Sequence, residues 1–533
     1  MAVNVDYSKV GLKVGIEIHQ QLDTAHKLFC SCDSELSTME PTVTFYRRLR
    51  PTQSELGEVD PAAAFEFERG RGFLYEAGPR TSCLVEMDEE PPHNLNEEAV
   101  DICLSVALLL KSRPVDEVHV MRKIVIDGSN TTGFQRTCII ALGGRVETGG
   151  KMIPLQTICL EEDAARKIGE DGLTTHYRID RLCIPLIEIA TAPAVRSPKE
   201  AERVALALGG VLRATRRVKR GLGTIRQDLN VSIRGGALIE IKGVQELGLI
   251  SRVVEYEVQR QLSLMKIRDE LARREAFKEV LKEEFMDVTE LFQKTGCRVI
   301  KDAIERGGVV LAAKLPKFGG LLMTELEPGV RFGGEMADYA RFWGRVGGIF
   351  HTDELPAFGI TPDEVVALKQ TLGAGETDVV VMVADNLENA ADALRAVLKR
   401  AREAIDGVPS ETRGAYPDGT THYSRPRPGA ARMYPETDVP PLPITEDRLA
   451  RIRASLPEPP EKMVNRLMEQ YNINRKLASQ LADSDYADLF ESIAQGTSVA
   501  PSFVAATLTE TLKSLRREGV ETTKISNVQI KEA

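Results

Sequence analysis

The sequence predicts an α+β protein with a large mixed antiparallel sheet, an inserted α+β domain and a helical C-terminal region. Three observations predict this fold class. Residues 1 to 265 contain repeated short segments in which apolar and polar residues alternate, as in β-strands. Short strand patterns then lie between helical patterns up to residue 405, and from Pro443 onward the apolar residues recur at helical spacing.

The length of the chain indicates several domains. With 533 residues, of which 42% are hydrophobic, it exceeds the roughly 250–300 residues at which a single core stops growing. We expect a first domain over residues 1–285 that resumes at 406–444, after an insertion of residues 286–405. We expect residues 445–533 to form a helical domain.

Individual segments predict their own elements. "LNEEAVDICLSVALLLKS" has helical spacing, and "TCIIALGGRVETGGKMIPLQTICL" alternates apolar runs with glycines, as an antiparallel meander does. Residues 252–286 and "NLENAADALRAVLKRAREAI" predict long helices, and "EKMVNRLMEQY" predicts a helix after a proline-rich stop. "GGRVETGGKM" is a turn and not a phosphate-binding loop, because Arg145 and Met152 replace its glycine and its Ser or Thr.

Composition excludes several classes of protein. No stretch approaches the ~18 apolar residues of a membrane span, and the N-terminus lacks a signal-peptide pattern, so we expect a cytoplasmic protein without membrane attachment. A net charge of −10 argues against indiscriminate nucleic-acid coating. The basic stretch "RATRRVKRG" is either a solvated helix face or a local contact for phosphates.

Eight scattered cysteines do not predict a disulfide framework. Cys30 and Cys32 form a CxC pair, which needs two further ligands to hold zinc. Cys83 and His93 could in principle supply them. Their irregular spacing favours the absence of a zinc site.

Polar residues on predicted strands suggest a pocket. "VGIEIHQQL" places Glu17, His19 and Gln21 on one face of a strand. Glu188 is the single carboxylate of the apolar strand "RLCIPLIEIATAP", and its burial would cost several kcal/mol without a cation or metal.

Three consecutive carboxylates, Glu161, Glu162 and Asp163, admit two interpretations. They either open a helix that continues through Arg166 and Lys167, or bind a divalent metal that offsets their mutual repulsion.

Two further strand patterns carry charges at alternate positions. "TIRQDLNVSIRGG" places Arg226, Asp228 and Asn230 on one face, and "ALIEIKGVQEL" adds Glu240 and Lys242. The pair is either a solvent-facing sheet surface or a second wall of the pocket.

Several longer motifs resemble one family. They are "VGIEIHQQL", "RKIVIDGSNTTGFQR", "LEEDAARK", "DRLCIPLIEIATAPAVRSPKEA", "IRQDLNVSI", "IEIKGVQEL" and "RPRPGAARMYPETDVPP". In order and spacing they are similar to the GatB/GatE family of tRNA-dependent amidotransferases, over essentially the whole chain. The insertion resembles that of bacterial aspartyl-tRNA synthetases, which points to the archaeal GatE branch. The family's tail domain is expected to be missing here.

The resemblance implies a ligase reaction, the formation of Gln-tRNA(Gln) with glutamine as amide donor. ATP phosphorylates the glutamate γ-carboxylate of Glu-tRNA(Gln), Mg²⁺ assists, and ammonia displaces phosphate. An asparaginase-like partner, the D component of the family's complex, would supply the ammonia in a heterodimer or a dimer of heterodimers. The alternatives are a non-catalytic tRNA-binding scaffold of the same complex and an ATP-dependent ligase acting on a free metabolite.

The resemblance also implies roles for individual residues. The expected metal ligands are Glu17, His19, Glu161, Glu162 and Glu188. The expected catalytic residues are Glu161, Arg181, Arg226, Asp228, Asn230, Glu240 and Lys242. The expected nucleotide-binding residues are Ser129, Asn130, Gln135, Arg226 and Lys242. Lys123 is expected on the ammonia route, with a surface lysine as the alternative.

Overall fold

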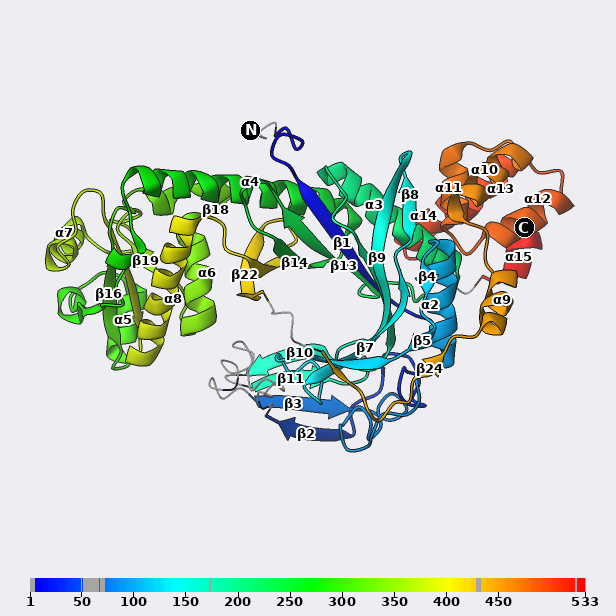
Figure 1. Cartoon of the computed structure of the whole chain (residues 1–533), viewed down its shortest axis with the longest axis horizontal. Helices are drawn as coiled ribbons and strands as arrows, with labels where there is room; N and C mark the ends of the chain where they lie inside the picture. The colour runs from blue at the N-terminus through cyan, green and yellow to red at the C-terminus, as the bar shows by residue number, and fades with distance from the viewer. Residues whose placement is uncertain are drawn as a thin grey trace. The chain divides into compact units, whose positions relative to one another are not determined.

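The computed structural model describes residues 5–48, 50, 67, 72–171, 174–427, 433–522 and 525–532. The chain divides into two compact units. Unit 1 comprises Met1–Glu17, Pro193–Glu202 and Arg226–Gly429, and unit 2 comprises Ile18–Ala192, Arg203–Ile225 and Ala430–Ala533. Sheets and helices occur together along the chain, with helices at its C-terminal end (Figure 1), so the predicted α+β class is confirmed. The predicted domain borders remain predictions.

The main sheet of unit 2 is antiparallel, with strand order β12-β9-β7-β6-β23. Its strands are β12 (Pro185–Thr191), β9 (Lys151–Glu162), β7 (Phe134–Leu142), β6 (Val120–Ile124) and β23 (Met433–Pro435). β8 (Arg145–Thr148) joins β9 through Gly149 and Gly150, whose φ angles of 56° and 75° suit a two-residue hairpin turn. The predicted antiparallel pairing and glycine turn are therefore confirmed, but the predicted meander is wrong, because β7 and β8 both pair with β9 and not with each other.

The predicted strand at residues 13–21 is also present, as β1 (Lys13–Gln21). Its apolar residues Val14, Ile16 and Ile18 are fully buried, as their alternation requires. The predicted first helix is α2 (Glu97–Leu109), which Asn96 caps and which packs against β7 and β9. Further elements of the chain are β4 (Arg113–Pro114), β5 (Glu117–Val118), α3 (Pro198–Ala214) and β24 (Leu442–Pro443).

A second sheet of unit 2 has strand order β10-β11-β3-β2. Its strands are β10 (Arg166–Asp171), β11 (Thr174–Arg178), β3 (Gly72–Ala77) and β2 (Val43–Arg47). The expectation of a helix at Arg166 and Lys167 is wrong, because both residues lie in strand β10. β10 pairs antiparallel with β11, and the Arg166 guanidinium donates to buried Asp180, so tertiary pairing decides the conformation of this segment.

Unit 1 contains a sheet whose order includes β22-β21-β14-β13. Its strands are β13 (Ile225–Ser232), β14 (Ile239–Val244), β21 (Glu411–Ala415) and β22 (Thr421–Pro426). β14 pairs antiparallel with β13 and parallel with β21, which makes the sheet mixed. The predicted long helix follows as α4 (Leu247–Arg273), which ends well before the predicted limit at residue 286, where β15 (Met286–Asp287) begins.

Between α4 and β21, unit 1 contains a small sheet of order β15-β16-β20-β19. Successive residues of β16 and β20 enter two different apolar clusters, so both faces of this sheet are covered. Its strands are β15 (Met286–Asp287), β16 (Val309–Leu315), β20 (Val379–Asp385) and β19 (Phe350–His351). The other elements of this stretch are α5 (Arg298–Glu305), β17 (Glu325–Glu327), β18 (Val330–Arg331), α6 (Phe332–Gly344), α7 (Pro362–Thr371) and α8 (Leu387–Asp406).

The C-terminal part of unit 2 is helical, as predicted. Its helices are α9 (Glu446–Ala454), α10 (Pro460–Tyr471), α11 (Arg475–Ala482), α12 (Ala487–Gly496), α13 (Pro501–Ala506), α14 (Leu512–Arg517) and α15 (Asn527–Glu532). Proline at the first position of α10 fits the sequence signal for its start. Leu467, Leu481 and Phe490 are fully buried in a core of this region.

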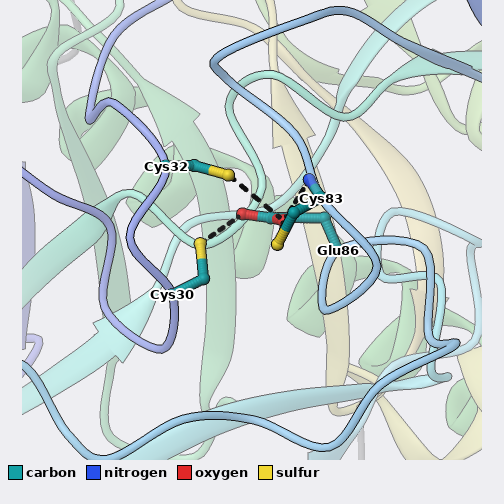
Figure 2. A group of neighbouring side chains, drawn as sticks. All are labelled: Cys30, Cys32, Cys83 and Glu86. Atoms are coloured by element: carbon teal, nitrogen blue, oxygen red, sulfur yellow. Dashed lines mark hydrogen bonds between the residues drawn. The ribbon is translucent and has the colours of Figure 1, made fainter.

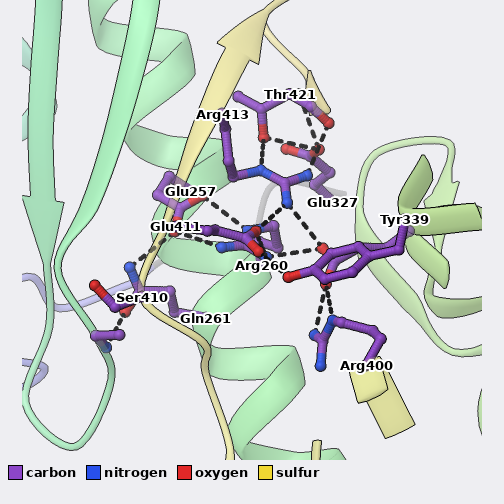
Figure 3. Close-up of polar contacts among 12 residues, drawn as sticks. Glu257, Arg260, Gln261, Glu327, Tyr339, Arg400, Ser410, Glu411, Arg413 and Thr421 are labelled. Atoms are coloured by element: carbon purple, nitrogen blue, oxygen red, sulfur yellow. Dashed lines mark hydrogen bonds and ion pairs between the residues drawn. The ribbon is translucent and has the colours of Figure 1, made fainter. Parts of the chain in front are cut away.

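A buried ion network joins four elements of unit 1 (Figure 3). Glu335 of α6 accepts from Arg260 of α4 at 2.7 Å and from Arg400 of α8 at 3.0 Å. Arg413 of β21 lies 3.3 Å from the same carboxylate. Arg260 also pairs with Glu257 at 2.9 Å, and Arg413 pairs with Glu411.

The network contains three guanidinium groups and three carboxylates, so its formal charges balance. Glu327 of β17 lies beside it, with Oε1 accepting from the Thr421 backbone at 3.0 Å. Burial raises the pKa of Glu327 to about 7, although Arg413 favours its ionised form. The three cations of the network are already matched by three carboxylates, so the buried Glu327 has no cation of its own, which is consistent with the raised pKa of Glu327.

Candidate functional site

One candidate metal site lies in unit 2, where His19 of β1, Glu161 of β9 and Glu188 of β12 converge. Their ligand atoms all lie within 4.8 Å of one another. In the antiparallel pair of β12 and β9, Glu188 is opposite Cys159, which makes Glu161 its diagonal neighbour on the same face. The His19 Nε2 atom is 3.0 Å from Glu188 Oε2.

The surroundings of this group favour a bound cation. Glu161 and His19 are 3% and 5% exposed. Burial, reinforced by the negative charge of Glu188, raises the pKa of Glu161. Lys123 Nζ is 3.9 Å from Glu161 Oε1, and the Gln135 amide donates to Glu161 Oε2 at 3.1 Å. Two crowded carboxylates and an imidazole form a donor set that suits a divalent ion.

Glu162 points away from this group because neighbouring strand residues face opposite sides of the sheet. It is 1% exposed, and its Oε1 accepts from the Arg136 backbone at 2.7 Å. Its Oε2 accepts from the Cys183 thiol at 3.1 Å. Arg136 also donates to Glu436 at 2.8 Å. The ligand role expected for Glu162 stays a prediction, but its contacts are those of a buried ion-paired residue.

A second acidic group lies in unit 1 and consists of Glu17, Asp228 of β13 and Glu240 of β14, again within 4.8 Å. The pairing of Asn230 with Glu240 brings the polar faces of β13 and β14 together, as their alternation predicts. Asn230 Nδ2 donates to Glu17 Oε1 at 2.8 Å. All donors are carboxylate oxygens, the ligands that Mg²⁺ prefers.

Lys242 lies among these carboxylates. Its Nζ is 3.1 Å from Asp228 Oδ2 and 2.8 Å from Glu240 Oε1. Burial alone would lower the pKa of Lys242, but Asp228 and Glu240 outweigh that effect and raise it. The site therefore carries a permanent ammonium beside an anionic cluster, an arrangement that can hold a phosphate together with its metal ion.

The other residues predicted to be catalytic or to bind the nucleotide do not form one group in the structure. Arg181 donates to the backbone oxygens of Ala164 and Ala165 at 2.7 and 3.0 Å, so it fixes the turn after β9. Ser129 donates to Asp127 at 2.6 Å, and Asn130 is 2% exposed in the same loop. Gln135 lies with Glu161 rather than with that loop. Arg226 lies on β13, half-buried.

The basic stretch of residues 213–220 is paired with acidic side chains of unit 2. Arg213, Arg216 and Arg220 contact Asp483, Asp488 and Asp485 of the helical region. Arg217 pairs with Glu98, and Lys219 lies 3.7 Å from Asp23. These basic residues therefore lie in ion pairs with partly exposed side chains, which contribute little stability each, and their contact with phosphates stays a prediction.

Three cysteines and one glutamate also converge in unit 2 (Figure 2). This group of four possible metal ligands is contrary to the expectation, from the spacing of the cysteines, that no zinc site would form. Cys30, Cys32 and Cys83 surround the Glu86 carboxylate. His93, the ligand considered from sequence, instead pairs with Glu90 at 2.9 Å. The signal that could have identified Glu86 is its position three residues after Cys83, a common spacing for two ligands on one turn.

Among the described residues, no helix has the length and apolar character that crossing a membrane would require.

Known proteins resemble the chain over almost all of its length. The family profile of the GatB/GatE catalytic domain matches residues 12–450. A protein of Aeropyrum pernix, named as the E component of glutamyl-tRNA(Gln) amidotransferase, is 56% identical over 98% of this chain and 82% of its own length. Proteins of the same name from Thermococcus gammatolerans and Methanocaldococcus jannaschii are 54% and 51% identical, over 100% and 99% of this chain and 84% of each relative. A family profile that covers most of the chain and identities above one half leave one conclusion: the chain belongs to the GatB/GatE family.

Proposed function

We propose that this chain is the transamidating component of a tRNA-dependent amidotransferase and converts Glu-tRNA(Gln) to Gln-tRNA(Gln). The names of its relatives support the reaction class. The observation that carries the proposal is the buried group of His19, Glu161 and Glu188. Such a group serves phosphoryl transfer, because that reaction depends on cations at the phosphate oxygens more than on covalent groups of the protein.

The proposed reaction has two steps. First, an oxygen of the tRNA-bound glutamate γ-carboxylate attacks the γ-phosphorus of ATP, an O–P bond forms, and ADP leaves. Second, ammonia attacks the activated carbonyl carbon, a C–N bond forms, and phosphate leaves with the proton that the nitrogen releases. Phosphorylation is required because a carboxylate oxygen is otherwise a poor leaving group.

The side chains of the chain would bind and orient the reactants. We assign His19, Glu161 and Glu188, and separately Glu17, Asp228 and Glu240, to Mg²⁺ binding. Mg²⁺ bound there would neutralise charge on the phosphate oxygens during transfer. Lys242 and Arg226 would bind phosphate, while Asn230 holds the Glu17 carboxylate in place through its 2.8 Å hydrogen bond.

Ammonia must come from a partner, for which we propose the asparaginase-like D component of a cytoplasmic complex. Lys123 is our candidate residue on the ammonia route, because it lies at the edge of the carboxylate group with a side chain about one-third exposed. We also propose that the insertion between α4 and β21 resembles that of bacterial aspartyl-tRNA synthetase and contributes to tRNA binding together with the C-terminal helices.

The decisive experiment supplies the purified chain with ATP, Mg²⁺, ammonium and Glu-tRNA(Gln). ADP is measured, and the aminoacyl group is identified after release from the tRNA. Glu188→Gln removes one anionic ligand at nearly constant volume and should abolish both products while tRNA affinity stays unchanged. Glu147→Gln, an exposed glutamate on β8, is the matched control and should behave as wild type.

The outcomes separate the proposal from its alternatives. Gln-tRNA formation without any partner supports the proposal. A non-catalytic scaffold would bind tRNA without forming ADP. A ligase for a free metabolite would retain activity after deletion of residues 445–533. Wild-type turnover by Glu188→Gln at limiting Mg²⁺ would refute the metal assignment.

A further inference from the structure

A cluster of three thiols and one carboxylate lies outside the groups assigned above. Cys30 and Cys32 come from the turn after β1, and Cys83 and Glu86 come from the turn after β3, more than fifty residues later in the sequence. In Figure 2 all four side chains point toward one another. Every pair of their ligand atoms lies within 4.8 Å.

The spacing agrees with a tetrahedral zinc site. Zinc binds sulfur at about 2.3 Å and carboxylate oxygen at about 2.1 Å, which places tetrahedral ligands roughly 3.5–3.8 Å apart. The Glu86 oxygens lie 3.0 Å from Cys30 Sγ, 4.0 Å from Cys32 Sγ and 3.1 Å from Cys83 Sγ. Small shifts of the side chains would equalise these distances around one ion.

Ordinary packing gives little reason for this arrangement. Lys27 and the Cys83 backbone N–H already stabilise the buried Glu86 carboxylate, and thiols are weak hydrogen-bond donors, so the convergence of three thiols on it adds little stability. A disulfide would use two of the thiols and would leave the third thiol and the carboxylate unexplained. Three sulfur ligands and one oxygen ligand are, in contrast, a complete ligand set for zinc.

A buried lysine supplies the charge balance that such a site needs. Lys27 is 1% exposed, and its Nζ lies 3.1 Å from Glu86 Oε1. The ammonium also donates to the Thr81 backbone oxygen at 2.6 Å, which fixes it between the two turns. A zinc ion with three thiolates and one carboxylate carries two net negative charges, and the Lys27 ammonium offsets one of them.

We propose that Cys30, Cys32, Cys83 and Glu86 bind one Zn²⁺ ion, with Lys27 as the buried counter-ion of the site. Four protein ligands leave no position for a substrate, so the role of the ion is structural. The proposal is independent of the amidotransferase reaction.

The site has a specific structural consequence. Zinc would cross-link the turn that holds Cys30 and Cys32 to the turn that holds Cys83. Thr131 donates to the Glu86 backbone oxygen at 2.7 Å, which connects the second turn to the loop of Ser129 and Asn130. The ion would therefore fix the loop that carries two of the predicted nucleotide-binding residues.

The first measurement is the metal content of full-length protein without a polyhistidine tag, purified without added metal. We expect one zinc per chain, released when a mercurial reagent modifies the thiols. Protein prepared with Co²⁺ should show the near-ultraviolet charge-transfer band of cobalt–thiolate bonds. Absence of zinc together with absence of this band in folded wild-type protein would overturn the proposal.

Variants test the individual ligands. Cys83→Ser and Glu86→Gln should lose zinc at chelator concentrations that wild type resists, and Lys27→Met should weaken zinc binding by roughly 10- to 100-fold, as for other residues that support metal ligands. The control is Cys297→Ala, which replaces a buried cysteine of unit 1 that lies far from the cluster in sequence. This variant protein should retain zinc as the wild type does. Equal zinc retention by Cys83→Ser and wild type would refute the assignment. If Cys83→Ser does not fold, the cobalt spectrum of wild type still decides.

Discussion

Replacement of Glu327 by glutamine should remove a pH-dependent loss of stability from unit 1. Glu327 is fully buried beside a charge-balanced network, and its pKa is raised from 4.5 to about 7. An acid whose pKa is higher in the folded state binds more protons folded than unfolded between these two values. Its contribution to stability is therefore present below about pH 4.5 and is lost as the pH rises toward and through 7.

The magnitude follows from the size of the shift. A difference of about 2.5 units corresponds to roughly 3 kcal/mol over the complete titration, at about 1.36 kcal/mol per unit. Between pH 6 and pH 8, the window that stays above the isoelectric point near 5.5, the loss amounts to about 1 kcal/mol. The glutamine side chain of the Glu327→Gln variant would not titrate, and its amide oxygen can still accept from Thr421.

The assay is urea unfolding followed by tryptophan fluorescence at pH 6 and pH 8. Trp343 is the only tryptophan of the chain and lies on α6, next to the network, so it reports on unit 1. The free energy of unfolding of Glu327→Gln, relative to wild type, should rise by about 1 kcal/mol from pH 6 to pH 8. Other buried acids such as Glu403 titrate in both proteins, so their contributions to the free energy of unfolding cancel in the difference between variant and wild type.

Glu325→Gln, an exposed glutamate on the same strand, is the control and should leave the pH profile unchanged. Parallel profiles for wild type and Glu327→Gln would show that Glu327 titrates normally. A relative loss of stability at pH 8 would show that Arg413 stabilises an ionised Glu327, and the reasoning from burial would be refuted.

Three further predictions follow from the buried charges. Glu335→Gln removes the carboxylate shared by three arginines and should cost about 3–5 kcal/mol in the same fluorescence assay; a loss below about 1 kcal/mol would contradict this network. Glu162→Gln should lower the thermal stability with or without Mg²⁺, because it weakens the contacts of this side chain with Arg136 and Cys183. If Glu162 served only as a metal ligand, its replacement would instead reduce activity and leave the thermal stability unchanged. Lys123→Leu should reduce glutamine-dependent Gln-tRNA formation much more than ADP formation in the presence of Glu-tRNA(Gln); equal loss of both would place Lys123 at the phosphate instead.

The sequence by itself determined the elements whose pattern is local. Alternation at period two identified β1, β13 and β14 and the faces on which Glu17, His19, Asp228 and Glu240 lie. Helical spacing with capping or proline signals identified α2 and α10. These signals suffice because a strand or helix sorts its side chains by position in the chain, before any partner is known.

Only the tertiary structure decided which polar residues meet. The fourth member of the cysteine cluster, Glu86, lies 56 residues from Cys30, and its burial depends on a lysine from the first turn. Glu161 and Glu162 lie at the end of β9, paired with β12, and do not open a helix, and the strand at Arg166 depends on pairing with β11. The ion network around Glu335 joins side chains from α4, α6, α8 and β21. Contacts of this kind arise from strand register and helix packing between distant segments, which the residue pattern of one segment does not specify.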